Sequence, residues 1–382
     1  MEYRILGNTG LSVSVIALGC EGFVGKTEEQ VHSEMDFAIS KGINFIDMYA
    51  SNPDLRSNIG KALAERRQQF IIQGHLCTTW ENDQYLRTRD VEKTIASFED
   101  QLTRLHTDYL DIGMIHYVDS EEDFHEVFNG PIIQLALRLK EEGKIRHIGL
   151  SSHNPIVAKL AVESGLIEVL MFSINPCYDL QPPSENVDDL WADESYAHSL
   201  ENIDPEREKL YELCEQKGIG LDVMKAYGGG DLLSETNSPF GKAMTPVQCI
   251  EYALTRPAVA SVMVGCKSCD EMQAAINWCN ATKEEKDYTP IMAGMEKFSW
   301  QGHCMYCGHC APCSVGIDIA SVNKYYNLTI AQNEIPETVR EHYKTLSHHA
   351  SECIQCGQCE TNCPFGVAII EQMEKAVEKF GY

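Results

Sequence analysis

Long apolar runs are absent from this sequence, and basic residues are scarce beside acidic ones. A membrane-spanning helix needs about 20 consecutive apolar residues, and no stretch approaches that length although 43% of the residues are hydrophobic. Lys and Arg together number 31 against 57 Asp and Glu, which gives a net charge of −26. A surface of this sign repels nucleic acid and anionic membranes, so we expect neither as a partner.

A secretory signal is also missing. The first residues, MEYRILGNTG, do not place a basic segment before an apolar one, which predicts a cytoplasmic protein. Half of the 16 cysteines lack the spacing of a disulfide framework, so we expect them to be free thiols that mostly pack in the core of a protein from a reducing or anaerobic host. These are Cys20, Cys77, Cys177, Cys214, Cys249, Cys266, Cys269 and Cys279.

The other eight cysteines form two runs near the C-terminus. Each run places three cysteines at successive C-x-x-C steps and adds a fourth shortly after. Three thiolates at this spacing wrap one face of a 4Fe-4S cluster, and in two-cluster ferredoxins the fourth ligand comes from the other run. The sequence therefore predicts two clusters. The expected ligand sets are Cys304, Cys307, Cys310 and Cys363 for one, and Cys353, Cys356, Cys359 and Cys313 for the other.

The second run matches the bacterial ferredoxin pattern at every position, including Pro364. The first run departs from it, with two residues before Cys313 and with Ser314 in place of proline. Structural zinc sites use two pairs of ligands, and disulfide scaffolds belong to small secreted chains, so both alternatives fit less well. The spacing leaves open whether the clusters carry electrons or only support the fold.

Short apolar strands and amphipathic helices alternate through about the first 280 residues. Strands are expected at 13–18, 43–46, 70–72, 109–116, 145–150, 169–172, 220–224 and 259–264, with helices between them. This alternation predicts a (β/α)8 TIM-type barrel over residues 1–290, followed by a small helical ferredoxin-like domain over 291–382 that holds two clusters. A doubly wound sheet would need Gly-x-Gly-x-x-Gly after its first strand, and Gly19-Cys-Glu-Gly22 does not fit.

The C-terminal ends of barrel strands are where catalytic groups gather. Those ends carry Asp47 and Tyr49, His75, His116 and Lys225. A single histidine at such a position is more often structural, but several proton-handling groups at one rim favour a functional site. The long segment 175–204 after the sixth strand is either a lid or a surface excursion.

Six segments carry a family pattern. They are Tyr3-Arg-Ile-Leu-Gly-Asn-Thr-Gly-Leu11, Gly42-Ile-Asn-Phe-Ile-Asp47, Asp108-Tyr-Leu-Asp-Ile-Gly-Met-Ile-His116, Gly143-Lys-Ile-Arg-His-Ile-Gly-Leu-Ser-Ser152, Met224-Lys-Ala-Tyr-Gly-Gly-Gly230 and Val264-Gly-Cys-Lys-Ser268. With them the chain resembles the aldo/keto reductase superfamily, in the branch that has a C-terminal ferredoxin-like domain, over nearly its whole length. The resemblance implies carbonyl reduction with NADPH by an Asp, a Tyr, a Lys and a His.

Two of these four residues carry over and two do not. Asp47 and His116 match, whereas Asn52 stands at the tyrosine position and His75 at the lysine position. An amide cannot act as a general acid, but an imidazole beside a carboxylate can. We therefore expect an Asp47–His75 acid/base pair, with His116 and with Tyr49 as a displaced phenol. The alternative is that the carbonyl-reductase site has decayed and the pocket does other work.

The resemblance also implies contacts to a nicotinamide cofactor. The matching positions are Ser151, Ser152, Lys225, Gly228, Gly229, Gly265, Lys267 and Ser268. The arginine usual for the adenosine phosphate is Ser268 here, which leaves NADP against NAD undecided.

Three functions remain in view. The first is a reductase whose clusters relay electrons to a small organic substrate, from ferredoxin or through a flavin such as FMN. The second is an NAD(P)H-dependent carbonyl reductase with structural clusters. The third is an electron-transfer subunit with an inactive barrel. We expect an oxidoreductase with a small-molecule substrate and favour nicotinamide over flavin, because the resemblance supplies contacts for it.

Overall fold

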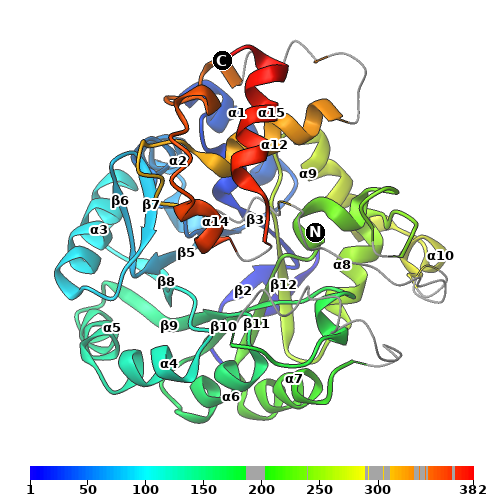
Figure 1. Ribbon diagram of the computed structural model, residues 1–382. Helices are drawn as coiled ribbons and strands as arrows, with labels where there is room; N and C mark the ends of the chain where they lie inside the picture. Colours follow the sequence, from blue (N-terminus) through cyan, green and yellow to red (C-terminus); the bar gives the residue numbers. More distant parts are fainter. Residues whose placement is uncertain are drawn as a thin grey trace.

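The first three quarters of the chain form a closed barrel of eight parallel strands with helices outside it (Figure 1). The computed structural model describes residues 1–185, 203–238, 240–288, 291, 304, 310–330, 335, 340, 343–363 and 366–382. Around the barrel the strands are β3 (Ile16–Gly19), β4 (Phe45–Met48), β5 (Ile71–Leu76), β8 (Leu110–Ile115), β9 (Ile145–Ser152), β10 (Val169–Ser173), β11 (Gly220–Met224) and β12 (Val259–Val264). The predicted TIM-type fold is confirmed.

Helices around the barrel begin at residues that satisfy unpaired backbone donors. Thr27, Asp90, Ser120, Thr245 and Ser268 each accept a hydrogen bond from the first turn of the helix that follows. The helices are α1 (Glu28–Ser40), α2 (Pro53–Leu63), α3 (Val91–Arg104), α4 (Glu121–Phe128), α5 (Pro131–Glu141), α6 (Pro155–Glu163), α7 (Pro205–Lys217), α8 (Pro246–Leu254), α9 (Cys269–Ile276) and α10 (Lys283–Lys286).

The expected bounds of the first strand were wrong. The strand expected at 13–18 is divided between β2 (Ser12–Ser14), which pairs with β1 (Tyr3–Ile5) in a separate hairpin, and β3 in the barrel. Helix α2 begins at Pro53, because proline suits the first turn of a helix and the preceding residue, Asn52, caps it.

The barrel interior changes from apolar to polar along its axis. Leu6 and Val13 of the β1–β2 hairpin join Phe45 and Met114 in an apolar cluster that fills the N-terminal end. Inward-facing positions recur every second residue along a strand. On β5 these positions run from Ile71 through Gln73 to His75, so polar side chains collect at the C-terminal end.

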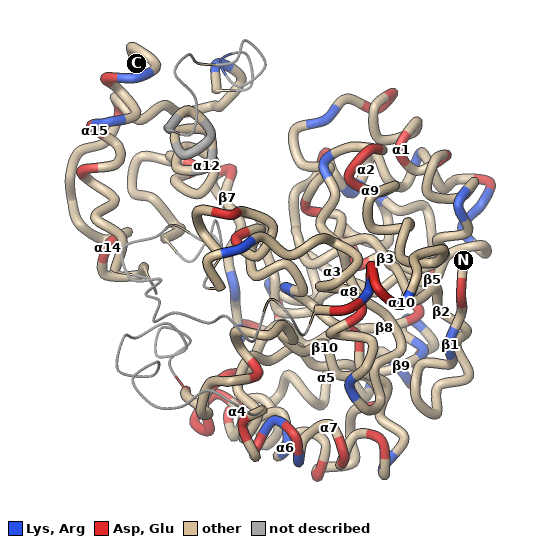
Figure 2. Tube along the Cα trace, turned by 90° about the vertical axis from the view of Figure 1, so that its right-hand side faces the viewer, with Lys and Arg blue, Asp and Glu red and all other residues tan. Residues whose placement is uncertain are grey.

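The C-terminal region lies over that polar end of the barrel, on the side opposite to the N-terminus (Figures 1 and 2). Its helices are α12 (Ile319–Ile330), α14 (Gln358–Asn362) and α15 (Ile369–Phe380). Ile319 and Val322 share one apolar cluster with Leu232, Phe240 and Met244 from the loop after β11. The C-terminal region therefore packs directly on the barrel. No described helix is long and apolar enough to cross a membrane.

Candidate functional site

Asp47, His75 and His116 meet inside the polar end of the barrel. His75 Nε2 lies 2.9 Å from Oδ1 of Asp47, and His75 Nδ1 lies 2.7 Å from Nδ1 of His116. The register brings them together, because β4, β5 and β8 are adjacent parallel strands. Asp47 and His75 are each 3% exposed and His116 is 7% exposed, so water scarcely competes for these hydrogen bonds.

A second carboxyl group lies deeper in the barrel. Gln73 Nε2 is 3.0 Å from Oδ1 of Asp47 and 3.5 Å from Oδ1 of Asp222 on β11. Burial raises the pKa of Asp222 well above its usual range, and the nearby charge of Asp47 raises it further. Both causes favour the protonated form of Asp222.

A hairpin that the sequence interpretation missed adds a phenol. It consists of β6 (Thr78–Glu81) and β7 (Gln84–Arg87), joined by Asn82–Asp83 with φ of 52° and 58°. The hydroxyl of Tyr85 contacts Nε2 of His116. Asn and Asp tolerate positive φ and favour such two-residue turns, so the Asn-Asp pair between two β-prone runs was the signal that could have revealed this hairpin.

Tyr49 approaches the same histidine but with its ring. The two rings stack with centroids 5.9 Å apart. Burial raises the pKa of Tyr49 well above its usual value, and the charge and a hydrogen bond of Glu21 raise it further. The Tyr49 hydroxyl is therefore directed to Glu21, and its predicted catalytic role stays a prediction.

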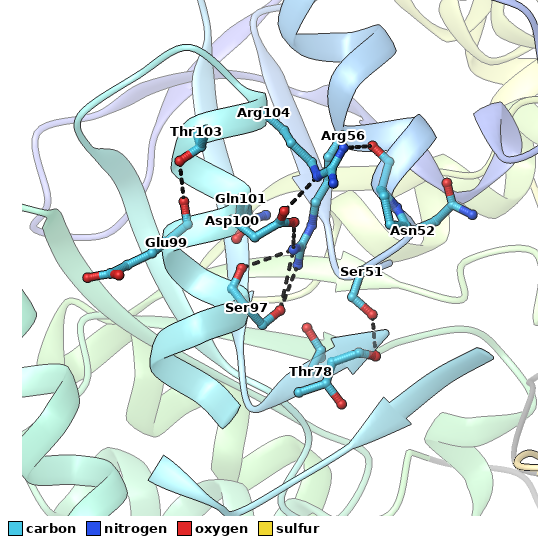
Figure 3. A network of polar contacts seen from close by, with 12 residues as sticks. Ser51, Asn52, Arg56, Thr78, Ser97, Glu99, Asp100, Gln101, Thr103 and Arg104 are labelled. Atoms are coloured by element: carbon cyan, nitrogen blue, oxygen red, sulfur yellow. Dashed lines mark hydrogen bonds and ion pairs between the residues drawn. The ribbon is translucent and has the colours of Figure 1, made fainter. Parts of the chain in front are cut away.

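Asn52, at the position where the resemblance implies a tyrosine, caps a helix instead. Its Oδ1 accepts a hydrogen bond of 2.8 Å from the backbone N–H of Leu55 at the start of α2. Buried Arg56 then ties α2 to Ser97 and Asp100 of α3 (Figure 3). A tyrosine side chain cannot make this cap. Residue 52 therefore supports the start of α2 here and does not take the acid role that the resemblance implies for a tyrosine.

His116 is held neutral by its surroundings. Burial lowers its pKa well below the usual value, and the charges of His75, Arg89 and Arg87 lower it further. Arg89 Nη1 also donates a hydrogen bond of 2.9 Å to the carbonyl oxygen of His116. The same arginine thus fixes the backbone of this histidine and disfavours its protonation.

Ser151 and Ser152, the two serines that the resemblance implies as nicotinamide contacts, differ in their hydrogen bonds. Ser152 Oγ donates to Asp119, which also accepts hydrogen bonds from the backbone and ring of His153. Burial alone would raise the pKa of Asp119, but the charge and hydrogen bonds of His153 lower it well below its usual range. Ser151 Oγ is buried and has no hydrogen-bond partner among the described residues. Ser151 is in register with Met171, which faces the barrel interior. Ser151 is therefore the member of the pair that is free to bind a ligand.

The expected phosphate seat at α9 already holds a carboxylate. Ser268 accepts the N–H of Glu271 in the first turn, and Glu271 Oε2 accepts the N–H of Lys267 at 2.7 Å. Lys26 binds the carbonyl oxygen of Lys267 at 2.6 Å. A bound phosphate would meet the charge of Glu271, so this helix end is poorly suited to the 2′-phosphate of NADP.

The glycine-rich segment after β11 takes conformations that suit close backbone approach. Lys225 and Gly228–Gly230 all have positive φ, and the three glycines open the short 3-10 helix Gly228–Leu233. Most of the long segment after β10, residues 186–202, lies outside the described residues.

Four expected ligands of one cluster line a single cavity. They are Cys313, Cys353, Cys356 and Cys359. Among the described residues, no three His, Cys, Asp or Glu side chains converge as they would around a single ion, and no described cysteine forms a disulfide. Each iron of a 4Fe-4S cluster takes one protein thiolate, so spaced thiols around a cavity fit a cluster better than zinc. For the other cluster, Cys304, Cys310 and Cys363 are described and Cys307 lies outside the described residues.

Gln84 joins this cluster region to the barrel. Its Oε1 accepts the N–H of Cys313 at 2.6 Å, and its Nε2 donates to the carbonyl oxygen of Cys313 at 3.1 Å. The next residue is Tyr85, which contacts His116. Adjacent residues of one hairpin therefore contact an expected cluster ligand and the histidines of the barrel.

Comparison with known proteins finds two family models that match this chain. Residues 15–248 match the model of the aldo/keto reductase family, and residues 300–367 match a 4Fe-4S dicluster domain. YqkF, an uncharacterized oxidoreductase of Bacillus subtilis, is 28% identical over 305 residues that cover 75% of this chain and 94% of that protein. The aldo-keto reductase YhdN of the same organism is 30% identical over 161 residues, which cover 40% of this chain and 47% of YhdN.

Among solved structures, the holo form of the aldo-keto reductase AKR11C1 from Bacillus halodurans has the same fold. It superposes with a TM-score of 0.60 at 24% identity and covers 79% of this chain and 99% of that one. Since the family model spans well over half of the sequence, this chain belongs to the aldo/keto reductase family and carries a 4Fe-4S dicluster domain on the C-terminal side of its barrel.

Proposed function

We propose that this protein reduces a small carbonyl or unsaturated compound at the barrel mouth with electrons that pass through its two 4Fe-4S clusters. The observation that carries the proposal is the β6–β7 hairpin. Gln84 holds both backbone groups of Cys313, and Tyr85 contacts His116. A purely structural cluster would not require a direct connection to the proton-handling side chains of the barrel.

The residues present fit this chemistry. Cys313, Cys353, Cys356 and Cys359 would hold one cluster, and the remaining cysteines of the two runs the other. A 4Fe-4S cluster supplies one electron at a time, so two clusters match the two electrons that reduction of one C=O or C=C bond consumes. The chain's own part is to bind and orient the substrate and to supply protons from the Asp47–His75–His116 group.

A nicotinamide hydride donor is the second candidate. Ser151 favours it, because its buried Oγ has no partner in the part of the chain that the structure describes. The positive φ angles of Gly228–Gly230 favour it as well. The carboxylate of Glu271 at the N-terminus of α9 favours NADH over NADPH. Because hydride transfer moves two electrons together, a flavin such as FMN would be needed between a nicotinamide and the clusters. Without nicotinamide, a cytoplasmic ferredoxin or a similar carrier would feed the clusters.

An anaerobic titration tests the proposal. The protein is purified without oxygen, and its visible cluster absorbance is followed after addition of NADH, then NADPH, then dithionite. Aldehydes, ketones and enones are then added one by one to the dithionite-reduced protein. We expect at least one compound to restore the oxidised cluster spectrum and to be recovered in reduced form. If the reduced clusters persist with every compound, the proposed function fails; bleaching by NADH would place nicotinamide upstream of the clusters.

A further inference from the structure

Four side chains form one continuous series of hydrogen bonds from the barrel interior to its mouth. The series runs from Asp47 to His75 at 2.9 Å, from His75 to His116 at 2.7 Å, and from His116 to the hydroxyl of Tyr85. The first three residues are buried, and Tyr85 is only partly so. The series therefore has a closed end at the carboxylate and an open end at the phenol.

Only one arrangement of hydrogens fits this series when Asp47 is ionised and both imidazoles are neutral. The carboxylate can only accept, so His75 carries its hydrogen on Nε2. Its Nδ1 must then accept, so His116 carries its hydrogen on Nδ1. The Nε2 of His116 is left as an acceptor, and the hydroxyl of Tyr85 must donate to it. In this resting state the Tyr85 hydrogen is directed away from the barrel mouth.

One added proton reverses the series. An imidazolium at His75 donates from both nitrogens, so the Nδ1 of His116 becomes the acceptor. His116 then carries its hydrogen on Nε2 and donates to the oxygen of Tyr85. The hydroxyl hydrogen of Tyr85 is released for a ligand at the barrel mouth. Protonation of His75 at the buried end therefore decides whether the Tyr85 hydroxyl can donate its hydrogen to a ligand at the open end.

We propose that Tyr85 is the proton donor of the barrel site and that Asp47, His75 and His116 form a relay that stores its proton before substrate binds. Its use in reduction rests on the proposed function; its hydrogen arrangement does not. In the transfer step the O–H bond of Tyr85 breaks and a new O–H bond forms on the substrate oxygen. The hydrogen on His116 Nε2 moves to Tyr85, and that on His75 Nδ1 moves to His116.

The transfer step leaves His75 neutral and restores the resting arrangement, so charge and atoms balance. The electron pair arrives separately. If the electron pair comes as a hydride, one proton from the relay is enough to form an alcohol. If it comes as two single electrons, the relay supplies two protons, one after the other. After product has left, a hydronium ion in the solvent at the mouth gives one proton to the Tyr85 oxygen, and the hydrogens shift back along the series to His75.

The surroundings direct the stored proton to His75 rather than to His116. Asp47 contacts His75 directly, whereas Arg87, Arg89 and His153 oppose a positive charge on His116. Burial, followed by the influence of Tyr117, raises the pKa of Tyr85 well above its usual value, so the phenol keeps its hydrogen until a substrate takes it. The ring of Tyr49 stacks on His116, and the rings of Tyr85 and Tyr117 meet it edge-on.

Neutron diffraction from deuterium-exchanged crystals of the complete, cluster-loaded protein tests the relay without a substrate. Data are collected at two pH values, about pH 8 and about pH 5. At the higher pH we expect deuterium on His75 Nε2, on His116 Nδ1 and on Tyr85 directed to His116. At the lower pH we expect His75 to gain a second deuterium and His116 to carry its own on Nε2. Deuterium on His116 Nε2 at the higher pH, or an unchanged His116 at the lower, would overturn the relay.

Nitrogen-15 spectra of the histidines give a second readout in solution. Protonation of His75 and the tautomer change of His116 should occur together in one titration, which a purely structural histidine pair would not show. Tyr85→Phe removes the hydrogen-bond partner of His116 Nε2 in both arrangements and should shift this titration. Tyr117→Phe, whose ring also meets His116 edge-on, should leave it in place. If the histidine titration is the same in both variants, Tyr85 is not the end of the relay.

Failure of the relay and failure of the proposed function can be told apart. The hydrogen positions and the histidine titration involve no substrate and no turnover. If they are as stated and the reduced clusters still pass electrons to no carbonyl or unsaturated compound, the proposed reduction is wrong and the relay serves another ligand. If turnover is found and His116 never changes tautomer, the relay is wrong and another group protonates the substrate.

Discussion

The barrel site and the cluster region hold their reactive groups in two different ways. In the barrel, Asp47, His75 and His116 satisfy one another through short hydrogen bonds. In the cluster region, the four thiols line a cavity, and the hydrogen bonds to Cys353 and Cys356 sulfurs come from Gln355 and Ser314 at 3.4 Å. The barrel site is complete without a ligand, whereas the thiols need iron to hold them in place. Removing iron should therefore disturb one region and spare the other.

The largest effect is expected from losing a cluster ligand. Cys356 is exposed, so Cys356→Ser changes little packing, yet it should remove one cluster, or about four of eight irons per chain. Iron analysis and the visible spectrum measure the loss. Cys269→Ser, at a half-buried cysteine outside both runs, is the matched control and should retain all iron. Full iron content in Cys356→Ser would contradict the assigned ligand set.

The barrel site should show the opposite pattern. The double variant His75→Ala, His116→Ala should keep its iron but lower turnover by about 10²- to 10⁴-fold, the usual contribution of acid/base groups. The measurement is the rate at which a compound found in the anaerobic titration reoxidises the reduced clusters. Undiminished turnover would remove both histidines from the chemistry.

Acid should weaken the barrel through its neutral buried histidines. The pKa of His116 is lowered in the folded protein, mainly by burial, so below about pH 6.5 the unfolded state binds more protons than the folded state. Stability should therefore fall as the pH drops through that value, by up to about 1.4 kcal/mol per pH unit for this group. His153 acts in the same direction. Thermal melting at a series of pH values, compared with His116→Gln, should show a flatter dependence in the variant; parallel curves would assign the effect elsewhere.

The smallest expected effect concerns Asn52. Asn52→Ala removes the cap of α2 and should lower the free energy of unfolding by about 1 kcal/mol, whereas Asn52→Asp should retain most of it. Chemical denaturation followed by helix content measures the difference. A large loss of iron in Asn52→Ala would mean that α2 supports the cluster region as well, which would blur the contrast between the two regions.

The sequence allowed a fuller prediction of the cluster ligands than of the contacts in the barrel site. Cysteine spacing is local, so the ligand sets of the clusters could be proposed directly, and the strand–helix alternation was regular enough to predict the barrel. The meeting of Asp47, His75 and His116 at one rim followed from strand ends in a parallel barrel. The contact of Tyr85 with His116 did not, because a hairpin inserted between β5 and α3 has no fixed register with the barrel. The structural role of Asn52 also required the true start of α2.

The β6–β7 hairpin has a consequence for how such a protein could arise. A single insertion between a barrel strand and its helix provides two contacts at once. Gln84 hydrogen-bonds Cys313 of the appended domain, and Tyr85 contacts His116 in the barrel. An ancestral barrel could then have lost its original phenol at position 52 without losing a phenol altogether. Domain recruitment and replacement of the acid would be one evolutionary event, and the hairpin is the segment to transplant when another barrel is engineered to accept a redox module.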